Sequence, residues 1–250
     1  MRASNHGELG LIVLSSCKEL GGLVDERILQ LRAEEDDDKS YLVPIEEVRF
    51  SNGEGKIKLL DSVRGKDIYI LCDVGNYSCE YTMFGRSHCM GPDEHFQDIK
   101  RVLSAIGGKA DRVTVIMPLL YASRQHKRKG RESLDCAMAL KELENLGVHA
   151  ILTFDVHDPT IHNAIPGTSF ENIFPTYSML KCFIANEGAN IKKDNMTVIS
   201  PDTGAMDRAI YYANTLGVDV GMFYKRRDHT VVVNGKNPIV QHEYIGGPLE

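Results

Sequence analysis

Side chains that could do chemistry gather in four short segments, each following an apolar run. Tyr121–Asp135 ("YASRQHKRKGRESLD") is rich in Arg and Lys, and Lys225–Arg227 is a second cationic group. The other two segments carry carboxylates and a histidine, in "DVHD" (155–158) and "SPDTG" (200–204). Lys and Arg neutralise phosphate oxygens, and carboxylates hold a magnesium ion that keeps several of its waters. These residue types together indicate a site for a polyphosphate and its divalent metal.

Each segment also has a purely structural interpretation when it is taken alone. A run such as Arg124–Arg131 is more often a solvated loop, or a weak nucleic-acid patch, than a catalytic loop. His157 could be hydrogen-bonded within the fold, Asp202 could cap a helix, and Lys225–Arg227 could be a strand end in water. The four segments together are harder to explain in this way. The formal net charge of −6, and the lack of aromatic residues within the cationic run, argue against nucleic acid.

An α/β fold would bring these segments to one edge of a sheet. Apolar, β-branched runs predict strands at Gly10–Leu14, Ile68–Cys72, Arg112–Pro118, Ala150–Phe154, Met196–Ile199 and Val218–Phe223. Apolar residues at three and four spacing predict helices at Cys17–Arg32, Pro92–Ile106, Arg131–Leu146 and Ala205–Leu216. Gly107, Gly147 and Gly217 lie where C-terminal caps belong. This alternation is typical of mainly parallel sheets, in which ligands bind at the carboxyl ends of the strands.

The chain is expected to form two such units. The alternation of strand and helix patterns is interrupted at "IPGTSFENIFP" (165–175), which has two prolines and a Gly-Thr-Ser turn. We therefore expect domains at 1–165 and 166–250. The apolar run Leu11–Leu14 is too short for a signal sequence, and no segment is long enough to span a bilayer, which favours the cytoplasm. The six cysteines form no CxxC pair and are expected to be reduced thiols. The spacing of Cys79, His88 and Cys89 does not favour a zinc site.

The sequence resembles the ribose-phosphate pyrophosphokinase family along nearly its whole length. The segments that carry the resemblance are "RFSNGE" (49–54), "SVRGKDIYIL" (62–71), "RQHKRKGRE" (124–132), "DVHDP" (155–159), "SPDTGAMDRA" (200–209) and "KRR" (225–227). No single segment is decisive, but their order and spacing together are highly specific. The resemblance implies an α/β fold of two tandem phosphoribosyltransferase-like domains with mainly parallel sheets, of which the second is incomplete.

The resemblance also implies an activity and its substrates. Family members transfer the β,γ-diphosphoryl group of ATP to ribose 5-phosphate, with Mg²⁺, and so form phosphoribosyl pyrophosphate and AMP for nucleotide synthesis. Phe50 is expected to stack on the adenine, with Asn52 and Glu54 near its edge, and a neighbouring subunit of a homo-oligomer would supply all three. Arg124 and Gln125 are expected to bind the nucleotide as well. Neither nucleic acid nor a membrane is an expected partner.

The remaining site residues are assigned by the same resemblance. His157 and Asp202 correspond to the magnesium site, and His157 is also expected to take part in catalysis. Lys225 and Arg227 correspond to a mobile loop that closes over the transition state. Closure of such a loop would add positive charge only once the substrates are in place.

The sequence departs from the family pattern in several places. Asn52 stands where the family usually has Asp, the run after Gln125 differs and is shorter, and Tyr77–Gly91 has no close match. The sequence ends at "EYIGGPLE" (243–250), where the family would begin the strand before its ribose-phosphate loop. We therefore expect either a fragment of a longer synthetase or an inactive relative. Such a relative would bind nucleotide and co-assemble with an active synthetase.

Overall fold

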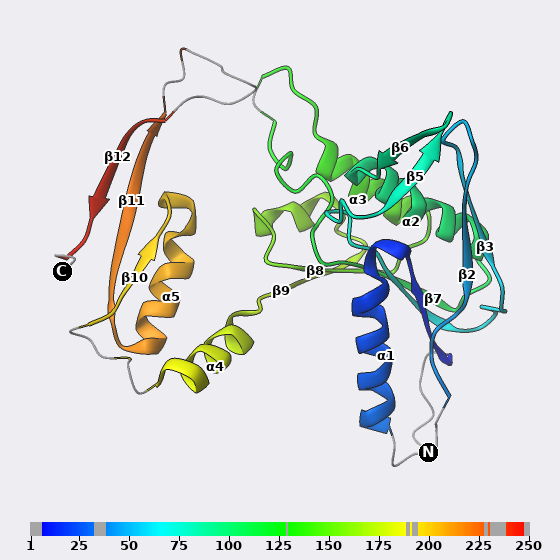
Figure 1. Cartoon of the computed structure of the whole chain (residues 1–250), viewed down its shortest axis with the longest axis horizontal. Coiled ribbons are helices and arrows are strands. Elements are labelled where there is room, and N and C mark those ends of the chain that lie inside the picture. Colours follow the sequence, from blue (N-terminus) through cyan, green and yellow to red (C-terminus); the bar gives the residue numbers. More distant parts are fainter. Residues whose placement is uncertain are drawn as a thin grey trace. The chain divides into compact units, whose positions relative to one another are not determined.

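The structure, a computed structural model, describes residues 7–32, 39–128, 130–188, 191, 195–227, 230 and 239–247 (Figure 1). The chain divides into two compact units, Met1–Phe174 and Pro175–Glu250. Strand β9 (Ser169–Ile173) pairs with β8 (Ala150–Phe154) in the sheet of the first unit. The first unit therefore extends past residue 165, where the sequence suggested the boundary.

The first unit is built on a parallel sheet whose strands follow the order β1-β4-β7-β8-β9. Besides β8 and β9, the sheet contains β1 (Leu9–Val13), β4 (Asp67–Leu71) and β7 (Arg112–Met117). On the free side of β1, the Leu11 amide donates to the Tyr41 carbonyl at 2.7 Å, and the Val43 amide donates to the Leu11 carbonyl at 2.7 Å. Residues 41–43 thus pair along the free edge of β1.

Helices cover both faces of this sheet. On one face, α2 (Pro92–Ile106) and α3 (Asp135–Asn145) enclose the larger core, which includes Ile70. On the opposite face, α1 (Lys18–Arg32) packs over a smaller core that includes Leu71. Because neighbouring residues of a strand point to opposite faces, both faces must be apolar, and this explains the continuous apolar runs in the sequence.

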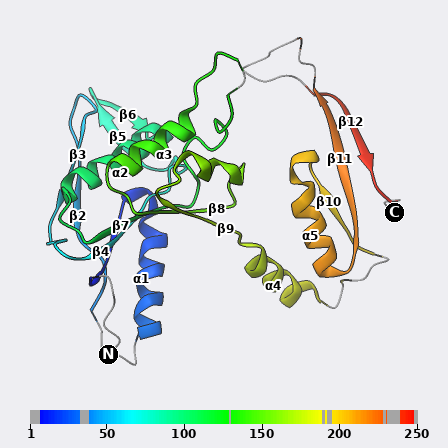
Figure 2. The same ribbon diagram turned by 180° about the vertical axis from the view of Figure 1, so that it is seen from behind.

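Two antiparallel hairpins lie beside each other at one end of the first unit (Figures 1 and 2). Strands β2 (Ile45–Arg49) and β3 (Gly55–Leu59) form the first hairpin. Strands β5 (Glu80–Met83) and β6 (Arg86–Cys89) form the second hairpin. The sequence predicted neither. The second hairpin occupies the segment in which the family resemblance was weak.

The second unit contains a three-stranded sheet with the order β10-β11-β12. Strands β10 (Thr197–Ser200) and β11 (Asp219–Arg227) are parallel, whereas β12 (Ile239–Ile245) runs antiparallel to β11. Helices α4 (Thr176–Glu187) and α5 (Met206–Leu216) complete the unit. The predicted strand Val218–Phe223 corresponds to β11, which continues to Arg227. The prediction that it ends at Phe223 and is followed by a cationic loop was wrong. Strand β11 continues because β12 supplies backbone partners along it.

Two expectations from composition can be compared with this fold. The six cysteines form no disulfide in the structure. Among the described residues, no helix combines the length and the apolar character needed to cross a membrane.

Candidate functional site

The structure brings two of the predicted segments together at the carboxyl edge of the first sheet. Strands β7 and β8 are parallel neighbours. We call residues 118–134, which follow β7, the cationic loop, and residues 155–158, which follow β8, the His157 loop. The His126 and His157 rings lie 4.9 Å apart, and Lys127 Nζ lies 2.6 Å from Asp158 Oδ2. The prediction that all four segments lie at one edge of one sheet is confirmed for these two only. It was wrong for Asp202 and Lys225–Arg227, which belong to the separate sheet β10-β11-β12.

Asp158 is the electrostatic link between the two loops. Its carboxylate accepts a hydrogen bond from Lys127 and two from Thr160, and it lies 3.3 Å from His126 Nε2. The Lys127 ammonium, followed by the Thr160 donors, holds the pKa of Asp158 well below its usual range. Arg124 and Arg128 are exposed and make no salt bridge within the described part of the chain. Both can therefore meet an incoming anion, as can the exposed Arg131.

The His157 loop is fixed by its backbone. Asp155 has a φ of 48°, in the left-handed region that Asp tolerates better than most residues. Its amide donates to the Ile173 carbonyl at 3.1 Å, and the Val156 amide donates to the Asn172 side chain at 3.1 Å. Val156 is buried, whereas His157 is exposed. Strand β9 thus holds the loop so that the imidazole lies at the surface.

The other predicted nucleotide residues lie on residues 50–54, between β2 and β3, which we call the Phe50 turn. The Phe50 amide donates to the Glu54 carbonyl at 2.8 Å, and the Glu54 amide donates to Asn52 Oδ1 at 3.1 Å. Asn52 therefore uses its side-chain oxygen to hold the turn, as an Asp could also do. Phe50 is 47% exposed. Gln125, by contrast, lies in the cationic loop, where its backbone amide donates to the Ala122 carbonyl at 2.8 Å.

A buried ion pair anchors the Phe50 turn to α2. Asp98 is 5% exposed and accepts hydrogen bonds from Arg49, just before the turn, and from Arg101 at 2.7 Å. Figure 1 shows the turn, at the tip of β2 and β3, far from the cationic loop that leads into α3. Within one chain, the two parts of the predicted nucleotide site are therefore separate.

Three predicted residues belong to the second unit. Asp202 follows β10, and its Oδ1 accepts the Gly204 amide at 3.1 Å, so it caps the short helix Thr203–Ala205. The backbones of Lys225 and Arg227 pair with His242 and Ile239 in β12, with an irregularity between Arg226 and Arg227. The residues between Arg227 and Ile239 lie outside the described residues, apart from Thr230.

The two residues that the family resemblance assigns to magnesium lie in different units. His157 lies in the first unit and Asp202 in the second. In the described ranges, no three side chains of His, Cys, Asp or Glu gather into a metal cage, and this holds for Cys79, His88 and Cys89 as well. Magnesium is commonly held by one or two carboxylates together with substrate phosphates and waters. The carboxylate of Asp202 is a donor of the type that this ion uses.

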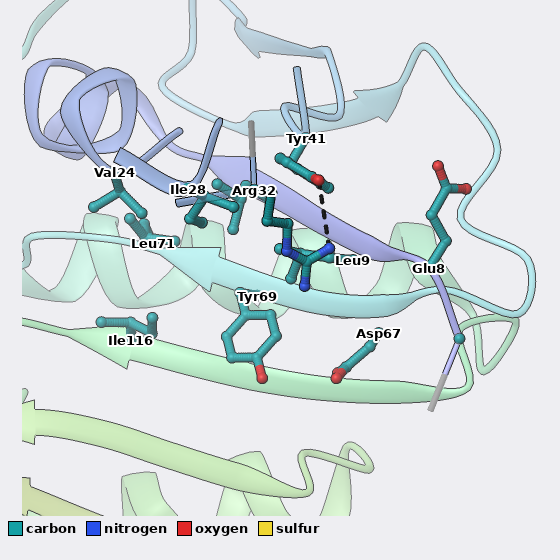
Figure 3. Close-up of a pocket in the computed structure, with 12 residues that line it drawn as sticks. Glu8, Leu9, Val24, Ile28, Arg32, Tyr41, Asp67, Tyr69, Leu71 and Ile116 are labelled. Carbon is teal, nitrogen blue, oxygen red and sulfur yellow. Dashed lines mark hydrogen bonds between the residues drawn. The ribbon is translucent and has the colours of Figure 1, made fainter. Parts of the chain in front are cut away.

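A separate apolar hollow lies on the face of the sheet covered by α1. Its volume is about 480 Å³, and Figure 3 shows Val24 and Ile28 of α1 above Tyr69 and Leu71 of β4. Arg32 donates to the Tyr41 hydroxyl at 3.4 Å beside it. The hollow extends toward the amino ends of β1 and β4, so it is distinct from the edge where the two loops meet.

Comparison with known proteins identifies the family. Residues 9–147 match the family described as the N-terminal domain of ribose phosphate pyrophosphokinase. This chain belongs to the ribose-phosphate pyrophosphokinase family. The match covers β1 through α3, and so it includes the Phe50 turn and the cationic loop.

Individual members of this family match over most of the chain. A ribose-phosphate pyrophosphokinase from Ralstonia nicotianae is 28% identical over 218 residues, which is 80% of this chain and 62% of the relative. One from Streptomyces coelicolor is 26% identical over 207 residues, covering 82% of this chain and 57% of the relative. The crystal structure of phosphoribosylpyrophosphate synthetase from Mycobacterium smegmatis superimposes with a TM-score of 0.69 at 22% identity, covering 94% of this chain and 67% of that chain. This likeness shows the shared fold.

Sequence reasoning missed two features of the site. The first is the pairing of Lys127 with Asp158, although opposite charges after neighbouring parallel strands are a usable signal. The second is the hydrogen bond between the two hairpins, from the Phe84 amide to the Ser51 carbonyl at 2.9 Å. No simple sequence pattern connects those two positions.

Proposed function

We propose that this chain carries the ATP-binding part of a ribose-phosphate diphosphokinase. The observation that supports this most directly is the meeting of the cationic loop with the His157 loop at the carboxyl edge of the first sheet. There, exposed Arg124 lies in the loop that approaches His157. A triphosphate at this edge would meet fixed positive charge beside a metal ligand, with Gln125 as a further polar contact.

The reaction needs charge stabilisation more than covalent help from the protein. The anomeric hydroxyl oxygen of ribose 5-phosphate attacks the β-phosphorus of ATP and loses its proton. The bond from the β-phosphorus to the oxygen of the α-phosphate breaks, and AMP leaves. Negative charge develops on the phosphate oxygens, and Arg124, Lys225 and Arg227 would neutralise it. Phosphoribosyl pyrophosphate is the second product, a precursor for nucleotide synthesis.

Magnesium would be held by His157 and Asp202 together with the phosphates of ATP. When bound, the ion neutralises charge on the phosphate oxygens and orients them. Two features of the chain suit this role, the exposed imidazole of His157 and the half-buried carboxylate of Asp202. We also place the protein in the cytoplasm, because its six free thiols are typical of a reducing compartment.

The adenine would be held by the Phe50 turn of a neighbouring subunit. Phe50 would stack on the base, while Asn52 and Glu54 would contact its edge. The turn and the cationic loop lie apart within one chain (Figure 1), so one nucleotide would need parts of two chains. The proposed assembly is therefore a homo-oligomer whose sites form between copies.

An AMP-release assay on the 250-residue chain, with ATP, Mg²⁺ and ribose 5-phosphate, tests the proposal. The proposal expects ATP binding that is measurable by calorimetry. ATP binding without AMP release fits a chain that carries only the ATP-binding part, or a nucleotide-binding relative that co-assembles with an active synthetase. AMP release that depends on the sugar and on Mg²⁺ would mean that the chain also holds ribose 5-phosphate. A chain that does not bind ATP would contradict both.

A further inference from the structure

The β5–β6 hairpin is joined directly to the Phe50 turn. The Phe84 amide, at the tip of the hairpin, donates to the Ser51 carbonyl at 2.9 Å. A methyl group added at Gly53 would lie 2.7 Å from Met83 Sδ and 3.8 Å from the Tyr81 ring. The two hairpins therefore pack closely at the residues proposed to hold the base (Figure 2).

The hairpin is also braced by α2 and β2. The Tyr81 hydroxyl donates to Glu94 in the first turn of α2, and Glu94 also accepts the Gly91 amide at 2.7 Å. The Arg49 guanidinium lies 5.5 Å from the centroid of the Tyr81 ring. Because Tyr81 attaches β5 to both α2 and β2, the tip of the hairpin is held in a defined place beside Ser51.

Phe84 is an unusual residue for this position. It forms a two-residue loop with Gly85, and both have positive φ, at 48° and 78°. Such loops favour Asn-Gly, because a bulky side chain in the left-handed region is strained. The strain is not offset by burial, since Phe84 is 76% exposed. Strained residues that lack a packing role within their own chain often act on a ligand.

We propose that Phe84 is a second aromatic contact for the adenine of ATP, beside Phe50. The inference rests on the proposed function, because it assigns the Phe50 turn to the base. The backbone of Phe84 is hydrogen-bonded to that turn, and its ring is exposed. Such a ring offers the flat apolar face on which a base stacks. The β5–β6 hairpin thus makes Phe84 a determinant of affinity for the base, with no contact to the phosphates.

Calorimetric titrations of the chain with ATP, and separately with inorganic tripolyphosphate, test this role. Phe84→Asn keeps the turn, because Asn tolerates positive φ, and should leave the melting temperature equal or higher. It should weaken ATP binding by about fivefold to a hundredfold, the range expected when one stacking contact is lost. Tripolyphosphate binding should not change. Phe84→Tyr retains the aromatic face and should bind ATP like the parent.

Two further variants separate this inference from the proposed function. Phe50→Ala should weaken ATP binding, whereas Tyr177→Ala, an exposed aromatic of α4, should not. If Phe50→Ala weakens ATP binding and Phe84→Asn does not, the role of Phe84 is overturned and the proposed function stands. If the parent chain does not bind ATP, both are overturned. Unchanged ATP affinity with a lower sedimentation coefficient in Phe84→Asn would also overturn the inference, because the ring would then cover a second copy of the chain.

Discussion

The two parts of the proposed nucleotide site are held in different ways. The cationic loop is joined to the His157 loop by Lys127 and Asp158, and the Lys127 side chain is 64% exposed. The Phe50 turn is held by backbone hydrogen bonds and, through Arg49, by Asp98, whose side chain is 7% exposed. One region thus depends on a surface charge pair and the other on a buried one.

This difference predicts how each region responds to a ligand. Surface ion pairs contribute little to stability and are screened by salt, so the loops can exchange partners when a phosphate arrives. Removing one partner of a buried pair is strongly destabilising, because it leaves an uncompensated charge. In the proposed site, the Phe50 turn would therefore be preorganised for the base, whereas the cationic loop could adjust to the phosphates.

The largest effect is expected from Asp98→Ala. Without this carboxylate, the Arg49 and Arg101 side chains, 15% and 23% exposed, would lose their shared partner. We expect the free energy of unfolding to fall by about 3 kcal/mol, measured by urea denaturation. The control is Glu142→Ala, which removes a more exposed bridge to Lys100 and should change stability by less than about 1 kcal/mol. Equal effects would remove the contrast between the two regions.

Arg124→Ala should chiefly change ligand binding. Loss of a charge-assisted contact to phosphate should weaken ATP binding by about 2 kcal/mol, or roughly thirtyfold, in calorimetry. Its control, Arg128→Ala, removes an equally exposed cation of the same loop and should have a much smaller effect. Similar losses in both variants would mean that the loop acts only as a general cationic patch. In that case the binding should also fall steeply with salt.

Much of the first sheet could be predicted from the sequence. The predicted strand Ile68–Cys72 corresponds to β4, because a strand buried on both faces must be apolar throughout. Helix α2 begins at Pro92 and ends before Gly107, as predicted. The loops after β7 and β8 could likewise be placed at one edge, because parallel strands put their carboxyl ends together.

Features that depend on distant partners could not be predicted. Strand β11 reaches Arg227 because β12 pairs with it, and the sequence of the strand does not reveal that partner. Helix α3 begins at Asp135 and not at Arg131, because the preceding residues belong to the cationic loop. The β5–β6 turn lacks the Asn-Gly signal, since Phe84 takes the place of Asn. Its contact with Ser51 therefore became visible only in the structure.

Gly53→Ala should separate strain from packing at the Phe50 turn. Gly53 has a φ of 88°, and an added methyl group would lie 2.7 Å from Met83 Sδ. We expect a loss of about 1.5 kcal/mol in thermal unfolding, from left-handed strain and from displacement of Met83. Gly85→Ala is the control, because its φ is 78° but no atom lies within 4 Å of the added methyl group. If both variants lose the same stability, the hairpins do not pack as tightly as described.

The smallest effect is expected from Asp158→Asn, and it should depend on pH. Because Lys127 holds the pKa of Asp158 below its usual range, the charged carboxylate adds stability above its ordinary pKa of about 4. That contribution is lost progressively as the pH falls below this value. Asn can still accept from the Thr160 amide, so the variant removes the charge while it keeps that hydrogen bond.

The stability difference between the parent chain and Asp158→Asn should be about 1 kcal/mol or less at pH 7, because Lys127 is exposed. It should shrink toward pH 3 and in high salt, as measured by urea denaturation at each condition. A difference that stays constant across this pH range would show that the charge on Asp158 does not hold the two loops together. The contrast with the buried Asp98 pair would then no longer be a contrast between two charge pairs.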